Sequence, residues 1–495
     1  MIDFDSERQA RQKKLIDLVA QKNDPFQNNF IKKHSVVQLQ VYVEDSKSTL
    51  AKIKTNWQVA GRIMQIRNFG KLIFARLVDE SGSLQILIDI ERSGLDCLSK
   101  FKNLDRGDII GINKCVLVKS NTGELTLLVF SFLLLAKSLE PLPEKYHGLV
   151  DVETRYRRRY LDLIINPDVR FVFRQRSKIM QLLRAFLNQE GFMELETPIL
   201  HELLTGAAAL PFKTFHNALN IPLYLRVAPE LHLKRLIVGG FEKIYEIGRL
   251  FRNEGISIKH NPEFTAIEVY QAYANLETMM TLTENLLKHL VHKLFSQFFI
   301  IYQKQKIDFT QSFKKMTMKE AVYQKINIDF NKIINLNQAK ELAKKHQIIL
   351  EKHQETIGHI LNLFFEKYVE KTLIQPTFIY EYPIEISPFA KSYCNNPKYT
   401  QRFELFIWGW EIANAFSELN DPNEQLKRFM KQTQERELGN QEANQVDEDY
   451  LLALRYGLPP TGGLGIGLDR LIMLLTNQTN IKDVILFPTL KPKLE

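Results

Sequence analysis

The sequence has few cysteines and no long apolar run. Its three cysteines, Cys97, Cys115 and Cys394, lie far apart and outside any C-x-x-C or Cys/His spacing, which argues against a disulfide framework and a structural zinc site. The longest apolar run, 127–136, contains a serine and is far shorter than the ~20 residues of a membrane helix. The first residues, MIDFDSERQARQKK, lack the apolar core of a signal peptide. We therefore expect a cytoplasmic protein that does not span a membrane.

The bulk composition is that of a globular protein of more than one domain. The chain has 495 residues, of which 45% are hydrophobic and 25% charged, and this length predicts two or three domains. The net charge of +9 favours a polyanionic partner such as nucleic acid. Basicity alone does not decide the partner, because many lysine-rich enzymes never bind RNA.

The pattern along the chain predicts an α+β protein with a small β-barrel at its N-terminal end. Residues 1–35 contain one expected helix, from about Ser6 to Ala20, which is either a solvated surface helix or one that faces RNA. Residues 36–140 carry about five short β-type runs, a pattern typical of an OB-fold barrel. Residues 141–150, with two prolines, read as a linker. We expect 151–495 to form a larger domain with a lysine-rich helical insertion at about 276–370.

The stretch from Glu246 to Tyr273 reads as two strands joined by a polar loop. The two-residue period of a strand places Glu268 and Tyr270 on the same face. The loop carries Arg252, Glu254 and His260. Together these groups suit a site that binds both anions and cations, although a hairpin with one solvated face would show the same pattern.

A glycine-rich segment, GGLGIGLDRLIMLLTN at 462–477, follows near the end of the chain. It predicts a strand and then an apolar helix that begins near Arg470. Glycines let a base or phosphate approach the backbone, and an arginine there adds to the positive end of the helix dipole. Close packing of the strand on the helix would also explain the glycines. The spacing matches neither a P-loop nor the Rossmann fingerprint.

Residues 402–421, RFELFIWGWEIANAFSELND, read as two strands around Gly409. The turn could bring Glu404 and Glu411 together, and two carboxylates beside a triphosphate are suitable ligands for Mg²⁺. Solvent-exposed glutamates on a strand are the simpler explanation for each one alone. On the second strand, three residues share one face: Asn414, Phe416 and Glu418.

Taken together, these stretches resemble the signature motifs of class II aminoacyl-tRNA synthetases. FLNQEGFMELETPIL with Pro198 resembles motif 1, LFRNEGISIKHNPEFTAIEVYQAY resembles motif 2, and GGLGIGLDR resembles motif 3. The segments TGAAALPF, APELHLKRL and SELND are similar to those of lysyl-tRNA synthetases, more than to aspartate or asparagine relatives. The resemblance covers the whole chain, most loosely at 276–370. It implies an OB-fold anticodon-binding domain, a catalytic domain on an antiparallel sheet flanked by helices, and a lysine–tRNA ligase reaction that uses ATP.

The resemblance also implies roles for individual residues. The residues expected to bind ATP are Arg252, Glu254, His260, Phe264, Glu404, Glu411 and Arg470. Those expected to bind lysine are Gly206, Glu230, Arg252, Glu268, Tyr270, Asn414, Phe416 and Glu418. In this scheme Arg252 and Arg470 are catalytic, Phe264 stacks on adenine, and Glu230 with the backbone of Gly206 takes the α-ammonium. The ε-ammonium goes to Glu268, Tyr270 and Glu418.

The same resemblance implies the cofactor and the partners. Glu404 and Glu411 would bind Mg²⁺. The partner nucleic acid would be tRNA(Lys), with Phe74 stacked on an anticodon base and with Gln85 and Glu124 reading base edges. A homodimer built on the motif 1 helix and the strand that ends at Pro198 is also implied.

Two departures from the family pattern concern the expected ATP side. Trp408 and Trp410 flank Gly409 where glycine and a basic residue are usual, and Leu210 stands where arginine is common. The tryptophans either narrow the metal or ATP site or pack harmlessly against the 276–370 region.

Other interpretations fit less of the sequence. The string KMTMK at 315–319 is like a class I signature but has no H-I-G-H-like partner. An aspartate or asparagine ligase would need a cation in the side-chain pocket, where this chain collects glutamates. A non-catalytic RNA-binding paralogue would be expected to lose Arg252, Arg470 or the metal carboxylates. A relative that lysylates a protein lacks the barrel expected here at 36–136.

Overall fold

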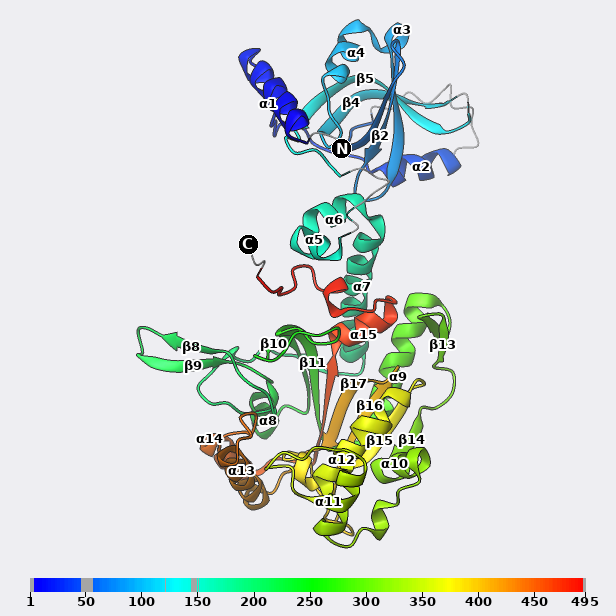
Figure 1. Cartoon of the computed structure of the whole chain (residues 1–495). Coiled ribbons are helices and arrows are strands. Elements are labelled where there is room, and N and C mark those ends of the chain that lie inside the picture. The colour runs from blue at the N-terminus through cyan, green and yellow to red at the C-terminus, as the bar shows by residue number, and fades with distance from the viewer. Residues whose placement is uncertain (1–3, 46–56, 121, 144–148, 150, 493–495) are drawn as a thin grey trace. The chain divides into compact units, whose positions relative to one another are not determined.

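The computed structural model describes residues 4–45, 57–120, 122–143, 149 and 151–492 (Figure 1). The chain divides into two compact units, Met1–Val150 and Asp151–Glu495. Most of the expected linker, residues 144–148 and 150, lies outside the described residues. No described helix has the length and apolar character needed to cross a membrane.

The N-terminal unit contains the expected five-stranded OB barrel. The strands close in the order β1-β2-β3-β5-β4. Their bounds are Val59–Asn68 for β1, Leu72–Val78 for β2, Ser83–Asp89 for β3, Ile109–Lys119 for β4 and Leu125–Ala136 for β5. Two short helices, α3 (Ile90–Ser93) and α4 (Leu95–Lys102), connect β3 to β4. Alternate residues on the strands, such as Ile73, Ala75 and Leu77 on β2, point into the apolar core.

The expectation of β-type structure from Val36 onward is wrong for the first ten residues. Val36–Asp45 is helix α2. Val36 and Leu39, three residues apart, are buried in the core of the barrel unit, while Val37 and Val41 remain exposed. Burial at a helical spacing therefore overrides the local alternation of apolar and polar residues.

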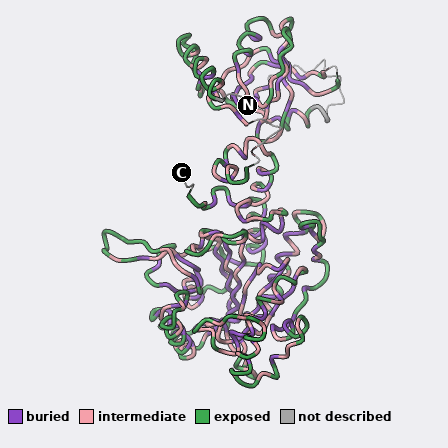
Figure 2. The backbone as a smooth tube through the Cα atoms, in the orientation of Figure 1, coloured by how far each residue is buried: buried purple, intermediate pink, exposed green. Residues whose placement is uncertain are grey.

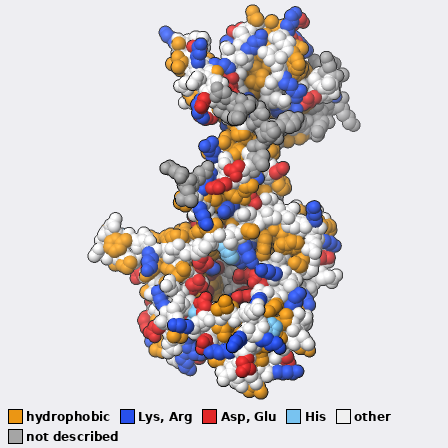
Figure 3. Space-filling model, viewed as in Figure 1, with side chains coloured by type: hydrophobic (Ala, Val, Ile, Leu, Met, Phe, Trp, Pro, Cys, Tyr) orange, Lys and Arg blue, Asp and Glu red, His pale blue; other side chains and the backbone are white. Residues whose placement is uncertain are grey.

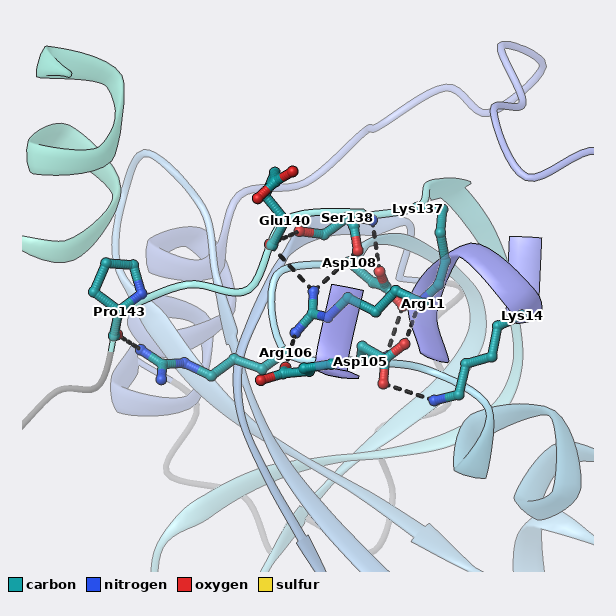
Figure 4. A network of polar contacts seen from close by, with 10 residues as sticks. Arg11, Lys14, Asp105, Arg106, Asp108, Lys137, Ser138, Glu140 and Pro143 are labelled. Atoms are coloured by element: carbon teal, nitrogen blue, oxygen red, sulfur yellow. Dashed lines mark hydrogen bonds and ion pairs between the residues drawn. The ribbon is translucent and has the colours of Figure 1, made fainter. Parts of the chain in front are cut away.

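The first helix, α1 (Phe4–Ala20), is held against the barrel by charged groups (Figure 4). Arg11 is almost fully buried and donates to the carbonyl of Ser138 at 2.9 Å. Lys14 pairs with Asp105 at 2.6 Å, and the buried Lys137 joins Asp105 to Asp108 at 2.6 and 2.7 Å. Arg11 and Lys14 are thus committed to the protein itself, so α1 is neither freely solvated nor wholly available to RNA.

The C-terminal unit is built on an eight-stranded sheet in the order β14-β15-β16-β17-β18-β11-β10-β6. Its strand pairs are antiparallel except for β6 with β10 and β14 with β15. In sheet order the bounds are Lys314–Thr317, Thr377–Pro383, Tyr399–Ile407, Trp410–Ser417, Thr461–Gly467, Glu263–Ala272, Lys243–Phe251 and Met193–Glu194. Figure 2 shows the strands as the most continuously buried part of this unit.

Helices cover both faces of this sheet. On one face, α7 (Pro167–Gln189), α9 (Leu276–Phe295) and α15 (Leu468–Leu475) form the main apolar core with β11, β16, β17 and β18. A second cluster joins α8 (Glu230–Val238), α13 (Pro422–Glu437) and α14 (Glu448–Gly457) to β10 and β11. Figure 1 shows these last three helices grouped together. Two further helices of this unit, α5 (Val152–Arg157) and α6 (Arg159–Ile165), precede α7. A small separate sheet contains β7 (Leu200–His201), β8 (Lys213–His216) and β9 (Ile221–Leu225).

The region 276–370 is not helical throughout, and it is not wholly separate from the main sheet. Helix α9 carries some of the most deeply buried residues of the core, and β14, which includes part of the KMTMK string, forms an edge of the eight-stranded sheet. The other elements are the hairpin β12 (Phe299–Tyr302) and β13 (Gln305–Asp308) and the helices α10 (Met318–Ile326), α11 (Leu336–Lys345) and α12 (Ile357–Tyr368). The lysine-rich composition of this region predicted helices. It gave no sign of the short strands, of which β14 pairs with a strand far along the chain.

Candidate active site

A cavity of about 400 Å³ opens on the C-terminal unit, and Figure 3 shows it as a hollow with acidic side chains on its walls. Nearly all the expected lysine and ATP residues line it. They are Gly206, Glu230, Arg252, Glu254, His260, Phe264, Glu268, Tyr270, Glu404, Glu411, Asn414, Phe416 and Arg470. Glu418 does not line the cavity itself; it lies fully buried beside Gly463, which does.

The glycines of β18 leave room for the side chains of the two neighbouring strands. Tyr270 on β11 and Phe416 on β17 both lie opposite Gly463, while Glu268 and Asn414 lie opposite Gly465. A Cβ at Gly463 would collide with Oε1 of Glu418 and lie 2.8 Å from the ring of Tyr270. The glycine-rich strand is therefore the floor of a site formed by polar groups on both sides.

Three carboxyl groups come together in this part of the site: Glu230 at the start of α8 and Glu418 just after β17 are buried, and Glu268 on β11 is half-buried. Tyr270 donates to Glu268 at 3.0 Å. Burial raises the pKa of Glu268 to about 8, with repulsion from Glu230 adding to the rise. Burial likewise raises the pKa of Glu230 and of Glu418, and Lys234 opposes the rise in both. Carboxyl groups clustered in this way indicate a site that binds cations.

The two arginines expected to act in catalysis differ in their contacts. Arg252 packs over the ring of Phe264 at 5.2 Å, and its buried Nε has no hydrogen-bond partner among the described residues. Arg470 donates to the backbone carbonyl of Glu411 at 3.0 Å and to its carboxylate at 3.2 Å, and lies 3.0 Å from Nε2 of His260. Burial and the nearby Arg470 lower the pKa of His260. The site thus contains an unpaired guanidinium donor and a second guanidinium already held in place.

The two expected metal carboxylates lie on the neighbouring strands β16 and β17 and line both this cavity and an adjoining one of about 400 Å³. Glu404 accepts hydrogen bonds from Arg402 at 2.6 Å and from Tyr382 at 2.8 Å. Burial raises the pKa of Glu404 to about 7; Arg402 opposes the rise and Glu411 adds to it. Within the described ranges, no group of three or more His, Cys, Asp or Glu side chains is arranged to hold a metal ion. Two carboxylates without a full cage suit Mg²⁺, which completes its shell with phosphate oxygens and water.

The two tryptophans pack away from the cavities. Trp408 and Trp410 meet the ring of Tyr302 on β12 edge-on, with centroid distances of 5.0 and 5.6 Å, and neither lines the two cavities. Of the two explanations for these residues, the structure favours packing against the 276–370 region. Leu210, the other departure, accepts a hydrogen bond through its backbone from Asn253 at 2.8 Å.

The expected anticodon residues form one patch on the outside of the barrel. Phe74 and Arg76 lie on the outward face of β2, and Arg76 is opposite Gln85 on β3. Arg76 also pairs with Glu124 at 2.8 Å, while Gln85 donates to Thr126 at 2.9 Å. Three residues far apart in sequence thus share a surface with an aromatic ring and hydrogen-bonding groups, as single-stranded RNA requires.

Comparison with known proteins gives the family. The model of class II tRNA synthetases (D, K and N) matches residues 151–491, and that of the OB-fold nucleic acid binding domain matches residues 57–135. The lysine–tRNA ligase of Bacillus subtilis is 50% identical over 492 residues, which cover 99% of this chain and 98% of that one. Those of Staphylococcus epidermidis and Mycoplasma mycoides are 49% and 48% identical over 494 residues, covering 99% of each chain. The chain belongs to the lysine–tRNA ligase family.

As a member of the lysine–tRNA ligase family, the chain is an enzyme that forms aminoacyl-tRNA. It activates lysine with ATP to lysyl adenylate and pyrophosphate, and then transfers lysine to the 3′ end of tRNA. The alternatives of a class I enzyme and of an aspartate or asparagine ligase fail against matches that extend over the whole chain.

Two charged residues of this lysine–tRNA ligase were not predicted as part of the site. Arg402 contacts Glu404 at 2.6 Å and Asn414 at 3.0 Å. Its place two residues before Glu404 on a strand could have shown that the two share a face. Lys234 lies between Glu230 and Glu418. Its spacing of four residues from Glu230 on a helix is the only local signal for that contact.

Proposed function

We propose that the cavity of the C-terminal unit is where lysine is activated, and that three clustered carboxylates select lysine by its two ammonium groups. The observation that carries this proposal is the convergence of the buried Glu230 and Glu418 with the half-buried Glu268 in one cluster. An amino acid that lacks the ε-ammonium would leave a buried carboxylate unpaired, which costs about 3–5 kcal/mol. Glu230 with the backbone of Gly206 takes the α-ammonium, and Glu268, Tyr270 and Glu418 take the ε-ammonium.

The first chemical step is attack of the lysine carboxylate on the α-phosphorus of ATP. A carboxyl oxygen forms the new bond to phosphorus, and the bond to the leaving pyrophosphate breaks. The carboxylate is already ionised, so the step needs no general base. Arg252, whose buried Nε has no hydrogen-bond partner among the described residues, binds the carboxylate and the α-phosphate, and Arg470 stabilises the negative charge that develops on the phosphates. Phe264 stacks on adenine, and Glu254 and His260 complete the ATP contacts.

Glu404 and Glu411 are the residues that would hold Mg²⁺. Their fit rests on two features of the structure: both carboxylates line the two adjoining cavities, and burial with mutual repulsion keeps the pKa of Glu404 raised, so that a cation is favoured there. A bound Mg²⁺ would neutralise charge on the phosphates. Arg402 and Tyr382 fix the orientation of Glu404 for this role.

In the second step, the terminal ribose hydroxyl of tRNA attacks the carbonyl of lysyl adenylate. The new ester bond forms as the bond between the carbonyl and AMP breaks, and the hydroxyl proton leaves with the departing phosphate or to water. The barrel patch of Phe74, Gln85 and Glu124 recognises the anticodon of tRNA(Lys), with Arg76 holding Glu124 in place.

Lysine binding is expected to release a proton because of Glu268. Its pKa of about 8 means that the carboxyl carries a proton at pH 7 in the free protein. The ε-ammonium favours the ionised form, so binding at pH 7 expels that proton. Calorimetric titration of lysine in buffers with different ionisation enthalpies measures the number released. The Glu268→Gln variant should release about one proton fewer than the wild type, and equal release by both proteins would contradict the placement of Glu268 at the ammonium.

Replacing Phe74 by alanine should weaken tRNA recognition without affecting lysine activation. Loss of a base–aromatic stack of about 1–3 kcal/mol predicts a KM for tRNA(Lys) raised about tenfold. The measurements are the tRNA dependence of aminoacylation and ATP–pyrophosphate exchange without tRNA. Phe130→Ala, which removes an exposed phenylalanine from β5, is the matched control. An unchanged KM for tRNA in the Phe74→Ala variant would remove this residue from the anticodon site.

We further propose that the enzyme acts as a cytoplasmic homodimer. The helix and strand expected at the dimer interface expose large apolar side chains, which argue for a protein partner. They are Phe171 on α7, Met193 on β6, Ile199 just before β7, and Leu200 on β7.

A further inference from the structure

Lys234 on α8 is a fully buried cation in contact with the proposed lysine site. Its side chain has no exposed area, and its Nζ lies 2.5 Å from Oε1 of Glu230 and in ion-pair contact with Oε2 of Glu418. The rings of Phe389 and Phe416 lie 5.0 and 5.4 Å from the ammonium. Burial disfavours the charged form, but attraction by the two glutamates outweighs it and raises the pKa of Lys234. The residue is therefore a permanent ammonium inside the pocket.

The resident ammonium sets the charge that the pocket presents to a substrate. Lys234 pairs with Glu230 and Glu418, whereas Glu268 contacts no cation among the described residues and accepts only from Tyr270. Once Glu268 has lost its proton as the substrate ammonium arrives, the three carboxylates and the ammonium of Lys234 carry a net charge of −2. The two ammonium groups of lysine carry +2, so the filled pocket is neutral once the lysine carboxylate is bound elsewhere.

The geometry also leaves acceptors free for the substrate. Lys234 contacts Oε2 of Glu418, while Oε1 of the same carboxylate faces the open space at Gly463 and has no partner in the described chain. On the other side, Lys234 contacts Oε1 of Glu230, a residue that itself lines the cavity. An orphaned buried acceptor in this position is suited to a ligand donor.

We propose that Lys234 is a positioning residue for amino-acid selection: its ammonium favours the ionised forms of Glu230 and Glu418 and orients both side chains, so that together they accept the two ammonium groups of a dicationic amino acid. This inference rests on the proposed lysine site. Without Lys234, Glu230 or Glu418 would retain a proton in addition to the one on Glu268, because this relieves the repulsion among the three carboxyl groups. A carboxyl that must first lose that proton binds an ammonium only at higher pH.

Several other titratable and charged groups lie near Lys234 or near its two carboxylates. Glu230, His232 and Arg235 lie on the same helix as Lys234, and Arg235 is engaged by Asp447 and Asp449 of the α14 end. The groups that face Lys234 or its two carboxylates from other elements are Glu418, Glu268 and Tyr270, Tyr450 on α14, and Arg402 on β16. Arg402 is the one cation among these groups from other elements, and it is already bound to Glu404 and Asn414. It is therefore not free to replace Lys234.

The test compares Lys234→Met, which keeps the length of the side chain but removes its charge, with Lys234→Arg, which keeps the charge. Arg235→Met is the matched control, because Arg235 is on the same helix and pairs with a buried aspartate outside the cavity. Lysine-dependent ATP–pyrophosphate exchange is measured from pH 6 to 8.5 with lysine and ATP varied separately. Thermal melting of each variant reports whether it is folded.

For Lys234→Met we expect the KM for lysine at pH 7 to rise about 100-fold, with the KM for ATP within about twofold of the wild type. In the plot of kcat/KM for lysine against pH, the rising limb should move to higher pH by about one unit or more. The reason is that a carboxyl group of Glu230 or Glu418 must lose its proton before it binds an ammonium. Lys234→Arg should keep the limb near its wild-type position, and Arg235→Met should change neither quantity.

A folded Lys234→Met variant with a wild-type KM for lysine and a wild-type pH limb would overturn the inference. If that variant does not fold, Lys234→Arg decides: a limb at the wild-type pH supports the role of the charge, and a limb displaced by about one unit contradicts it. Failure of the proposed function can be told apart from failure of this inference. If the proposed function is wrong, the wild-type protein itself shows no lysine-dependent exchange at any pH.

Discussion

Glu418→Gln is expected to lower kcat/KM for lysine activation on the order of 10³-fold and to leave the KM for ATP within about twofold of the wild-type value. The carboxylate is fully buried, and removing one partner of a buried ion pair costs about 3–5 kcal/mol. Lys234 would still be paired with Glu230, so the loss falls on the ε-ammonium of the substrate. ATP–pyrophosphate exchange with each substrate varied separately measures both quantities.

The control for this experiment is Glu437→Gln, which makes the same chemical change at an exposed position at the end of α13. It should behave as wild type. Lysine activation by Glu418→Gln equal to that of the control would exclude Glu418 from the ammonium site. A parallel loss of ATP binding would instead indicate that the variant is damaged beyond the lysine pocket.

Arg252→Ala should have a still larger effect, about 10⁴-fold on kcat for adenylate formation, because an arginine that stabilises phosphoryl transfer contributes about 10³–10⁵. The buried Nε of Arg252 lacks a partner in the described chain, and the guanidinium is held over Phe264 at 5.2 Å. Arg252→Lys should recover little of the activity, since an ammonium cannot make two parallel hydrogen bonds to a carboxylate or phosphate. Single-turnover adenylate formation with saturating lysine and ATP measures this step directly.

Arg249→Ala is the matched control for Arg252. It lies on β10, which ends one residue before Arg252, its side chain is partly exposed, and its ionic partner is Glu263 at 3.5 Å. This variant should form adenylate at close to the wild-type rate. If Arg252→Ala retained activity within about tenfold of Arg249→Ala, the transition-state role of Arg252 would be wrong.

The sequence is sufficient to predict the barrel, the two strands of motif 2, the hairpin around Gly409 and the convergence of the site residues. These features have strong local patterns or specific motifs. Glu268 and Tyr270 share a face because a strand has a period of two, and the structure joins them by a hydrogen bond. The individual roles of the site residues remain proposals that the variants above test.

Other features depend on contacts that a local pattern cannot show. The string VVQLQVYV alternates like a strand, yet it forms α2, because burying Val36 and Leu39 against the barrel decides between the two structures. Strand β14 has only four residues, and its partner β15 lies about sixty residues further along the chain. The position of Lys234 depends on Glu418, which is distant in sequence. In each case a tertiary contact outweighs the local preference.

The account depends most directly on which amino acid the purified protein activates. ATP–pyrophosphate exchange should be measured with each of the twenty amino acids in turn, with Mg²⁺ present and tRNA absent. A pocket with three clustered carboxylates and Arg252 predicts exchange with lysine alone. Exchange with aspartate or asparagine, or no exchange with any amino acid, would contradict the proposal that this pocket selects and activates lysine.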